Sequence, residues 1–91
     1  MKLLNDNILV SELQDDILQG TVVRYDADNP YMFCKVLNLS DKAKEYFDEN
    51  DVLVIKRYAK EEYLPGQYFV SLQDVRCKMS EDEYNNMIER R

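Results

Sequence analysis

The stretch Asn50-Asp51-Val52-Leu53-Val54-Ile55 decides the fold class of this 91-residue chain. Its last four residues are consecutive aliphatic side chains, and three of them are β-branched, a residue type that favours strands. The polar run 48–51 in front of them is typical of a turn. A short apolar run that follows a turn predicts a buried β-strand at residues 52–55.

Similar short apolar runs, separated by turn signals, occur on both sides of this strand. Asp28-Asn29-Pro30 and Pro65-Gly66 are strong turn sequences. Ser40 and Asp41 could cap a short helix over residues 41–47. The other expected strands are residues 8–10, 31–39, 58–63 (irregular or at a sheet edge), 68–72 and 75–79. Many short strands with only short helices predict a mainly β fold, a small β-barrel over residues 1–79.

The last twelve residues, 80–91, predict a helical tail. Ser80 with Glu83 three positions later forms a capping-box pattern at its start. Tyr84, Met87 and Ile88 would then lie on one side of the helix.

Charge and composition narrow the class of partner. The chain has 18 acidic and 12 basic residues, which give a net charge of −6. Its densest basic cluster (Lys56, Arg57, Lys60) is followed directly by the acidic residues Glu61 and Glu62. Nucleic acid would be repelled by such a chain. No apolar run approaches the roughly 18 residues of a membrane span, and the first seven residues are too polar for a signal peptide. We therefore expect a cytoplasmic protein that binds neither nucleic acid nor membrane.

Catalytic and metal-binding patterns are missing from the sequence. It contains no histidine and only two glycines, and its two cysteines, Cys34 and Cys77, do not form a CxxC pair. We expect both cysteines to be small buried hydrophobic residues in a reducing cytosol. The sequence predicts a protein without enzymatic activity or cofactor, which works by binding another protein.

The least strand-like part of the first half is residues 11–29. It is mostly polar, with a few short apolar pairs of residues. A loop of this length in a small domain is usually functional or disordered. The alternative is that Val22 and Val23 form another barrel strand, with Gly20 as its turn.

The order of these features resembles the GroES-type co-chaperonin family. Residues 4–10 (LNDNILV) are similar to that family's L-x-D-R-V-L-V strand, and residues 50–55 resemble V-G-D-x-V-L-F, with Asn50 where a glycine is usual. Residues 34–39 take the place of G-x-V-L-A-V-G. Residues 68–75 are similar to the closing E-Y-L-I-L-x-E-x-D-I-L segment, with one residue fewer in the turn.

The resemblance implies a ring, heptameric in the family, that caps a GroEL-type chaperonin and assists ATP-dependent protein folding. It also implies a mobile chaperonin-binding loop within residues 11–29. The residues implied to bind the chaperonin are Gly20, Thr21, Val22 and Val23, with Ile17 and Leu18 as the competing anchor. The residues implied to pair between subunits are Ile8, Leu9 and Val10 of one chain and Val75, Cys77 and Met79 of its neighbour.

The sequence also departs from the family pattern. Gln19 replaces the second glycine of the loop motif, residues 41–47 replace the roof hairpin, and residues 80–91 extend past the usual end. Such drift is typical of co-chaperonins carried by bacteriophages, which would place the chain in the cytoplasm of a bacterial host. The alternative is a ring-forming assembly or scaffold module, of viral type, with the same small barrel and no chaperonin contact.

Overall fold

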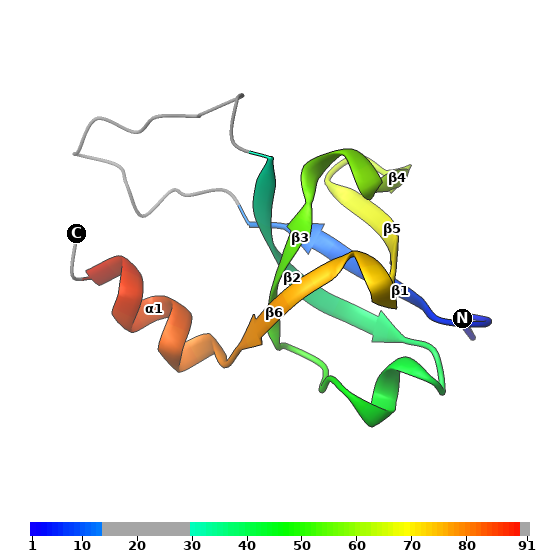
Figure 1. Ribbon diagram of the computed structural model, residues 1–91, viewed down its shortest axis with the longest axis horizontal. Helices are drawn as coiled ribbons and strands as arrows, with labels where there is room; N and C mark the ends of the chain where they lie inside the picture. The colour runs from blue at the N-terminus through cyan, green and yellow to red at the C-terminus, as the bar shows by residue number, and fades with distance from the viewer. Residues whose placement is uncertain (14–29, 90–91) are drawn as a thin grey trace.

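The computed structural model describes residues 1–13 and 30–89 (Figure 1). Within them the chain is mainly β, with a short C-terminal helix, as the sequence predicts. The strands and the helix are β1 (Asn7–Glu12), β2 (Tyr31–Leu39), β3 (Val52–Lys56), β4 (Glu61–Leu64), β5 (Gln67–Ser71), β6 (Val75–Met79) and α1 (Glu81–Glu89). Short 3-10 turns occupy Ala43–Glu45, Arg57–Ala59 and Leu72–Asp74.

The strands form one antiparallel sheet in the order β4-β5-β1-β2-β3-β6. In a flat sheet β5 and β6 would lie four strand spacings apart, about 19 Å. Only the turn Leu72–Asp74 joins them, and the four steps from Ser71 to Val75 reach at most about 14 Å. The sheet must therefore curl until its second and last strands approach each other, as Figure 1 shows.

The core fills the inside of this curl. Alternate residues of β2 (Met32, Cys34 and Val36) point inward and are buried, which explains why this strand is so rich in apolar residues. Leu53 and Ile55 of β3 meet them from the neighbouring strand. The remaining members of this cluster are Ile8, Val10, Leu39, Ala43, Phe47 and Val70.

Three described residues, Asn5, Asn50 and Gly66, have a left-handed backbone, and two of them form turns that the sequence predicts. Gly66 has a φ of 79° in the predicted Pro65-Gly66 turn between β4 and β5. Asn50 has a φ of 75° at the entry to β3, and its amide donates a hydrogen bond to the carbonyl of Val36 (3.3 Å). Asparagine tolerates this conformation better than most residues, so the polar turn before β3 forms where the sequence predicts it.

The helix predicted over residues 41–47 is wrong in length. The structure has only the 3-10 turn Ala43–Glu45 there. Ser40 accepts a hydrogen bond from the Ala43 amide through its hydroxyl (3.3 Å), and the fully buried Ala43 anchors the turn in the core. Phe47 reaches the core from just beyond this turn, whereas Tyr46 is 53% exposed, so the apolar residues of this stretch do not share one buried helical face.

The predicted C-terminal helix is confirmed as α1. The Ser80 hydroxyl accepts from the Glu83 amide (3.1 Å), and a Glu83 carboxylate oxygen accepts from the Ser80 amide (3.4 Å), which completes the predicted capping box. Tyr84 and Met87 pack against the sheet, while the side chain of Ile88 lies outside the described part. In the described ranges, α1 included, no helix has the length and apolar character needed to cross a bilayer.

Candidate functional site

The two ends of segment 14–29 leave the sheet side by side. β1 and β2 are antiparallel neighbours, and Glu12 faces Cys34 across the pair. The Leu13 amide extends this pairing by donating to the Phe33 carbonyl (3.1 Å). On the other side, the Arg57 amide donates to the Pro30 carbonyl (2.7 Å). The two flanks of segment 14–29 therefore lie at the adjoining ends of two central strands, β1 and β2.

The residues predicted to contact a chaperonin all belong to this segment. They lie outside the described residues: Ile17, Leu18, Gly20, Thr21, Val22 and Val23. The alternative that Val22 and Val23 form a further strand falls on the same undescribed residues.

A polar cluster fixes the base of the segment. Glu12 lies 4.0 Å from the Arg57 guanidinium and accepts a hydrogen bond from the Tyr68 hydroxyl (3.4 Å). The Arg57 guanidinium also donates to the Tyr31 carbonyl (3.2 Å), so one side chain links the end of β1 to the start of β2. Burial and the nearby Glu12 carboxylate raise the pKa of Tyr68. The cluster therefore joins the end of β1 to the start of β2 and to β5.

Helix α1 packs beside the same base. Tyr84 and Val52 are buried together, and Leu13, Phe33, Met79 and Met87 pack against them. The rings of Tyr84 and Phe33 lie 5.4 Å apart, and Lys35 pairs with Glu81 at 2.8 Å. Helix α1, which lies in the tail that extends past the family's usual end, thus packs in one cluster with Leu13, the residue that precedes segment 14–29.

The strand β1, which is predicted to pair with a neighbouring subunit, lies inside the sheet. Ile8, Leu9 and Val10 are buried, and β1 pairs with β2 on one edge and with β5 on the other. No strand edge is left there for a neighbouring chain. Sequence periodicity identifies a strand but does not reveal its position in the sheet.

The opposite half of that prediction fits the structure better. β6 is the last strand of the sheet and, among the described residues, pairs only with β3. Its three predicted residues, Val75, Cys77 and Met79, lie along this edge strand. Cys77 is exposed, against our expectation of a buried thiol, because it lies on the outward side of an edge strand. Cys34 is buried as expected, and burial raises the pKa of its thiol to about 12.

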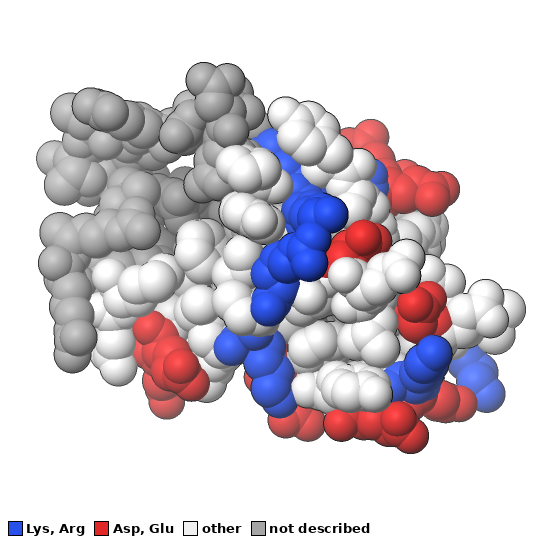
Figure 2. Space-filling model, viewed as in Figure 1, with Lys and Arg blue, Asp and Glu red and all other residues white. Residues whose placement is uncertain are grey.

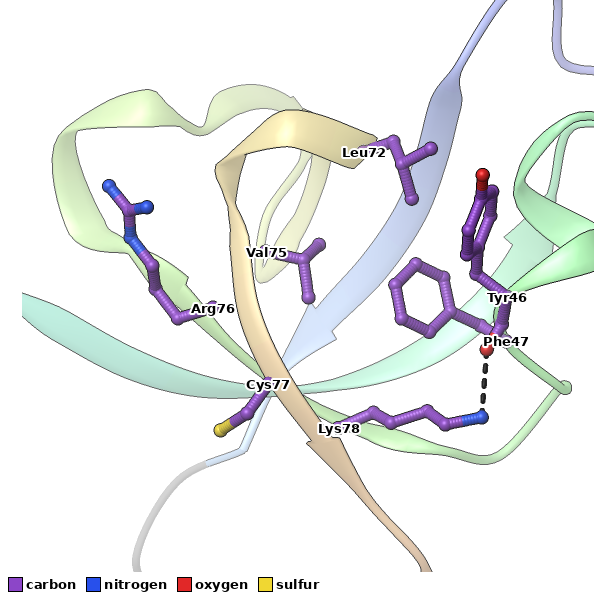
Figure 3. Close-up of a pocket in the computed structure, with 7 residues that line it drawn as sticks. All are labelled: Tyr46, Phe47, Leu72, Val75, Arg76, Cys77 and Lys78. Atoms are coloured by element: carbon purple, nitrogen blue, oxygen red, sulfur yellow. Dashed lines mark hydrogen bonds between the residues drawn. The ribbon is translucent and has the colours of Figure 1, made fainter.

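An apolar cleft runs along β6 (Figure 3). It has a volume of about 460 Å³ and is lined by Tyr46, Phe47, Leu72, Val75, Arg76, Cys77 and Lys78. Figure 3 shows Phe47, Leu72 and Val75 facing one another, while Arg76 and Cys77 point to the other side of the strand. The Lys78 ammonium donates to the Tyr46 carbonyl (2.8 Å) and so fixes one wall of the cleft.

Sequence reasoning missed the cleft and the charge around it. Figure 2 shows a line of Lys and Arg side chains across the face that carries β6. Lys56 at the end of β3 and Arg76 and Lys78 in β6 are exposed on adjacent strands. These residues are about twenty positions apart in the sequence, so the basic residues look dispersed until the sheet forms.

Among the described residues no group of His, Cys, Asp or Glu side chains is arranged to hold a metal ion. Compared with protein-family models and with curated protein sequences, the chain matches none. The function of the chain is therefore inferred from the geometry of the fold and from the motif resemblance.

Proposed function

We propose that this chain is a co-chaperonin, a ring-forming lid that caps a chaperonin cage and binds it through segment 14–29. The observation that supports this most is that the residues flanking the segment, Leu13 and Pro30, adjoin the ends of two neighbouring central strands, β1 and β2. Its two ends are tied by the Leu13 to Phe33 and Arg57 to Pro30 hydrogen bonds. A binding segment with both flanks fixed at the same end of the sheet is presented in the same direction by every copy in a symmetric ring.

The backbone of Asn50 supports the family resemblance independently. The family motif has a glycine at this position, and Asn50 has a φ of 75°, the conformation in which glycine is favoured. The substitution therefore keeps the backbone requirement of the motif. The segments that carry the resemblance correspond to β1, β2, β3 and β5 with the start of β6.

The ring would use the edge of β6 that is unpaired among the described residues. A neighbouring chain could add an extended segment to this edge and extend the sheet from one subunit into the next. The predicted partner, Ile8–Val10, is replaced in this proposal by residues 1–4, which precede β1. Met1 and Leu4 are both more than half exposed, so this segment has apolar side chains to offer.

The binding mechanism follows from the composition of segment 14–29. Apolar side chains in a polar segment gain free energy when an apolar groove takes them from water. Ordering of the segment offsets part of that gain, which keeps each contact weak and reversible. Several contacts from one ring then give high overall affinity through avidity. ATP hydrolysis belongs to the chaperonin in this scheme.

A chaperonin pull-down in the presence of ATP tests the proposal. We expect the wild type to bind, and Val22→Asp to reduce binding at least tenfold, because a charge replaces an apolar anchor. Leu64→Asp, at an exposed leucine of β4, is the matched control and should bind normally. Equal binding by wild type and Val22→Asp would refute the role of residues 20–23, and loss with Ile17→Asp alone would assign it to Ile17 and Leu18. A ring that binds no chaperonin would favour the assembly-module alternative.

A further inference from the structure

Two different contacts hold the chain where it enters segment 14–29. Successive residues of a strand point to opposite sides of the sheet. Glu12 accordingly joins the polar cluster at the base of the segment, while Leu13 packs on the other side, in the apolar cluster that contains Phe33 and Tyr84. The polar contact comes from the sheet itself, and the apolar one depends on helix α1.

The backbone hydrogen bond at Leu13 lies at the end of the β1–β2 pair. The Leu13 amide donates to the Phe33 carbonyl (3.1 Å), and this is the last described hydrogen bond between the two strands before segment 14–29. Hydrogen bonds at the ends of elements open more easily than those in the core. The side chains that pack around Leu13 therefore decide how often this bond opens.

Helix α1 holds both partners of this hydrogen bond. Tyr84 is buried, and its ring lies 5.4 Å from the ring of Phe33, while Leu13 packs in the same cluster. The ion pair between Lys35 and Glu81 (2.8 Å) ties the first turn of the helix to β2 as well. A helix of nine residues is marginal in water by itself, so α1 persists only while it is docked.

We propose that Tyr84 is a positioning residue for segment 14–29. Docking of α1 and the hydrogen bond between Leu13 and Phe33 form and open together, so the docked helix fixes one flank of the segment and the undocked helix releases it. A fixed flank lowers the entropy cost of ordering the segment on its partner. This inference rests on the proposed function and adds to it the element that controls how firmly the segment is held.

Amide exchange of single residues in the free, full-length protein tests the coupling. In Tyr84→Ala the Leu13 amide should exchange at least tenfold faster than in the wild type. The Arg57 amide, which donates to the Pro30 carbonyl at the other flank (2.7 Å), should keep its rate because it lies outside the cluster under α1. Tyr84→Phe keeps the ring and should keep the wild-type rate at Leu13. Asn85→Ala, at an exposed position of the same helix, is the matched control and should change neither amide.

The affinity of the same variants for a chaperonin, measured with ATP, tests the positioning role. Tyr84→Ala should raise the dissociation constant about threefold to tenfold, whereas Tyr84→Phe and Asn85→Ala should not. Met87→Asp places a charge in the same apolar cluster and, as a second way to undock the helix, should act like Tyr84→Ala.

Two results would overturn the coupling: an unchanged exchange rate at Leu13 in Tyr84→Ala, or equal acceleration at Leu13 and Arg57. Faster exchange at Leu13 with unchanged chaperonin affinity would overturn the positioning role. A wild type that binds no chaperonin would instead refute the proposed function. The exchange rates of the free protein would still decide whether α1 controls the flank.

Discussion

Removal of the Tyr84 side chain should detach helix α1 without unfolding the sheet. Tyr84 is 4% exposed and joins the helix to Phe33 and Val52, whereas α1 has only nine residues. Helices of fewer than about 12 residues are marginal in water, so packing must supply most of the stability of α1. Tyr84→Ala removes the largest part of that packing.

The size of the effect follows from two opposing contributions. An aromatic ring that buries about 200 Å² contributes roughly 5 kcal/mol at 25 cal/mol per Å². Fixing the backbone of residues 81–89 costs about 1 kcal/mol or more per residue, so the docked helix is only marginally stable. The loss cannot exceed the docking free energy, because an undocked helix simply unfolds. We therefore expect Tyr84→Ala to lower the free energy of unfolding by about 1–3 kcal/mol.

Urea unfolding followed by circular dichroism at 222 nm measures this loss, with a chain truncated after Met79 as the matched control. Tyr84→Ala and the truncation should have the same unfolding free energy, since both lose the same docking. The Tyr84→Ala variant should also lose the helical signal before the sheet unfolds. A helix that persists in Tyr84→Ala, or a truncated chain much less stable than the variant, would refute this reasoning.

Four further predictions concern individual residues. Asn50→Gly should leave the urea midpoint unchanged or raise it, while Asn50→Ala should cost about 1 kcal/mol because alanine pays for the positive φ. Ile8→Ala, at a fully buried core position, should cost about 2–5 kcal/mol in the same assay, and Tyr58→Ala, at a position 83% exposed, less than about 0.5 kcal/mol. Cys77 should react rapidly with a thiol reagent in the native state and Cys34 only on unfolding. Burial raises the pKa of Cys34 to about 12 in the folded protein, whereas the unfolded chain loses this proton near pH 9. The free energy of unfolding should therefore fall as pH rises from about 9 towards 12. A Cys34→Ala chain with the same decline would contradict this.

Local sequence signals determined which elements form. The strand at residues 31–39 and the capping box at Ser80 and Glu83 were predicted correctly, because both depend on neighbouring residues in the chain. The backbone of Asn50 also agrees with a motif in which glycine is usual. Such features require no knowledge of which strands pair.

The arrangement of the strands could not be predicted in the same way. Ile8–Val10 have a strand pattern whether β1 is central or at an edge, yet only an edge strand can pair with another chain. For the same reason, the exposure of Cys77 and the closeness of the basic residues of β3 and β6 follow only from the pairing of these two strands. The cleft along β6 and the exposed basic residues beside it therefore depend on the order of the strands in the sheet, which a single sequence does not specify.

Amide hydrogen exchange over residues 14–29 tests the central claim most directly. It is measured in the free protein and again with a chaperonin and ATP, with the amides of β3 as an internal standard. A chaperonin-binding segment should exchange fast in the free protein and become protected in the complex, while β3 is slow in both. Slow exchange of residues 20–23 in the free protein, or no added protection with the chaperonin, would contradict the account.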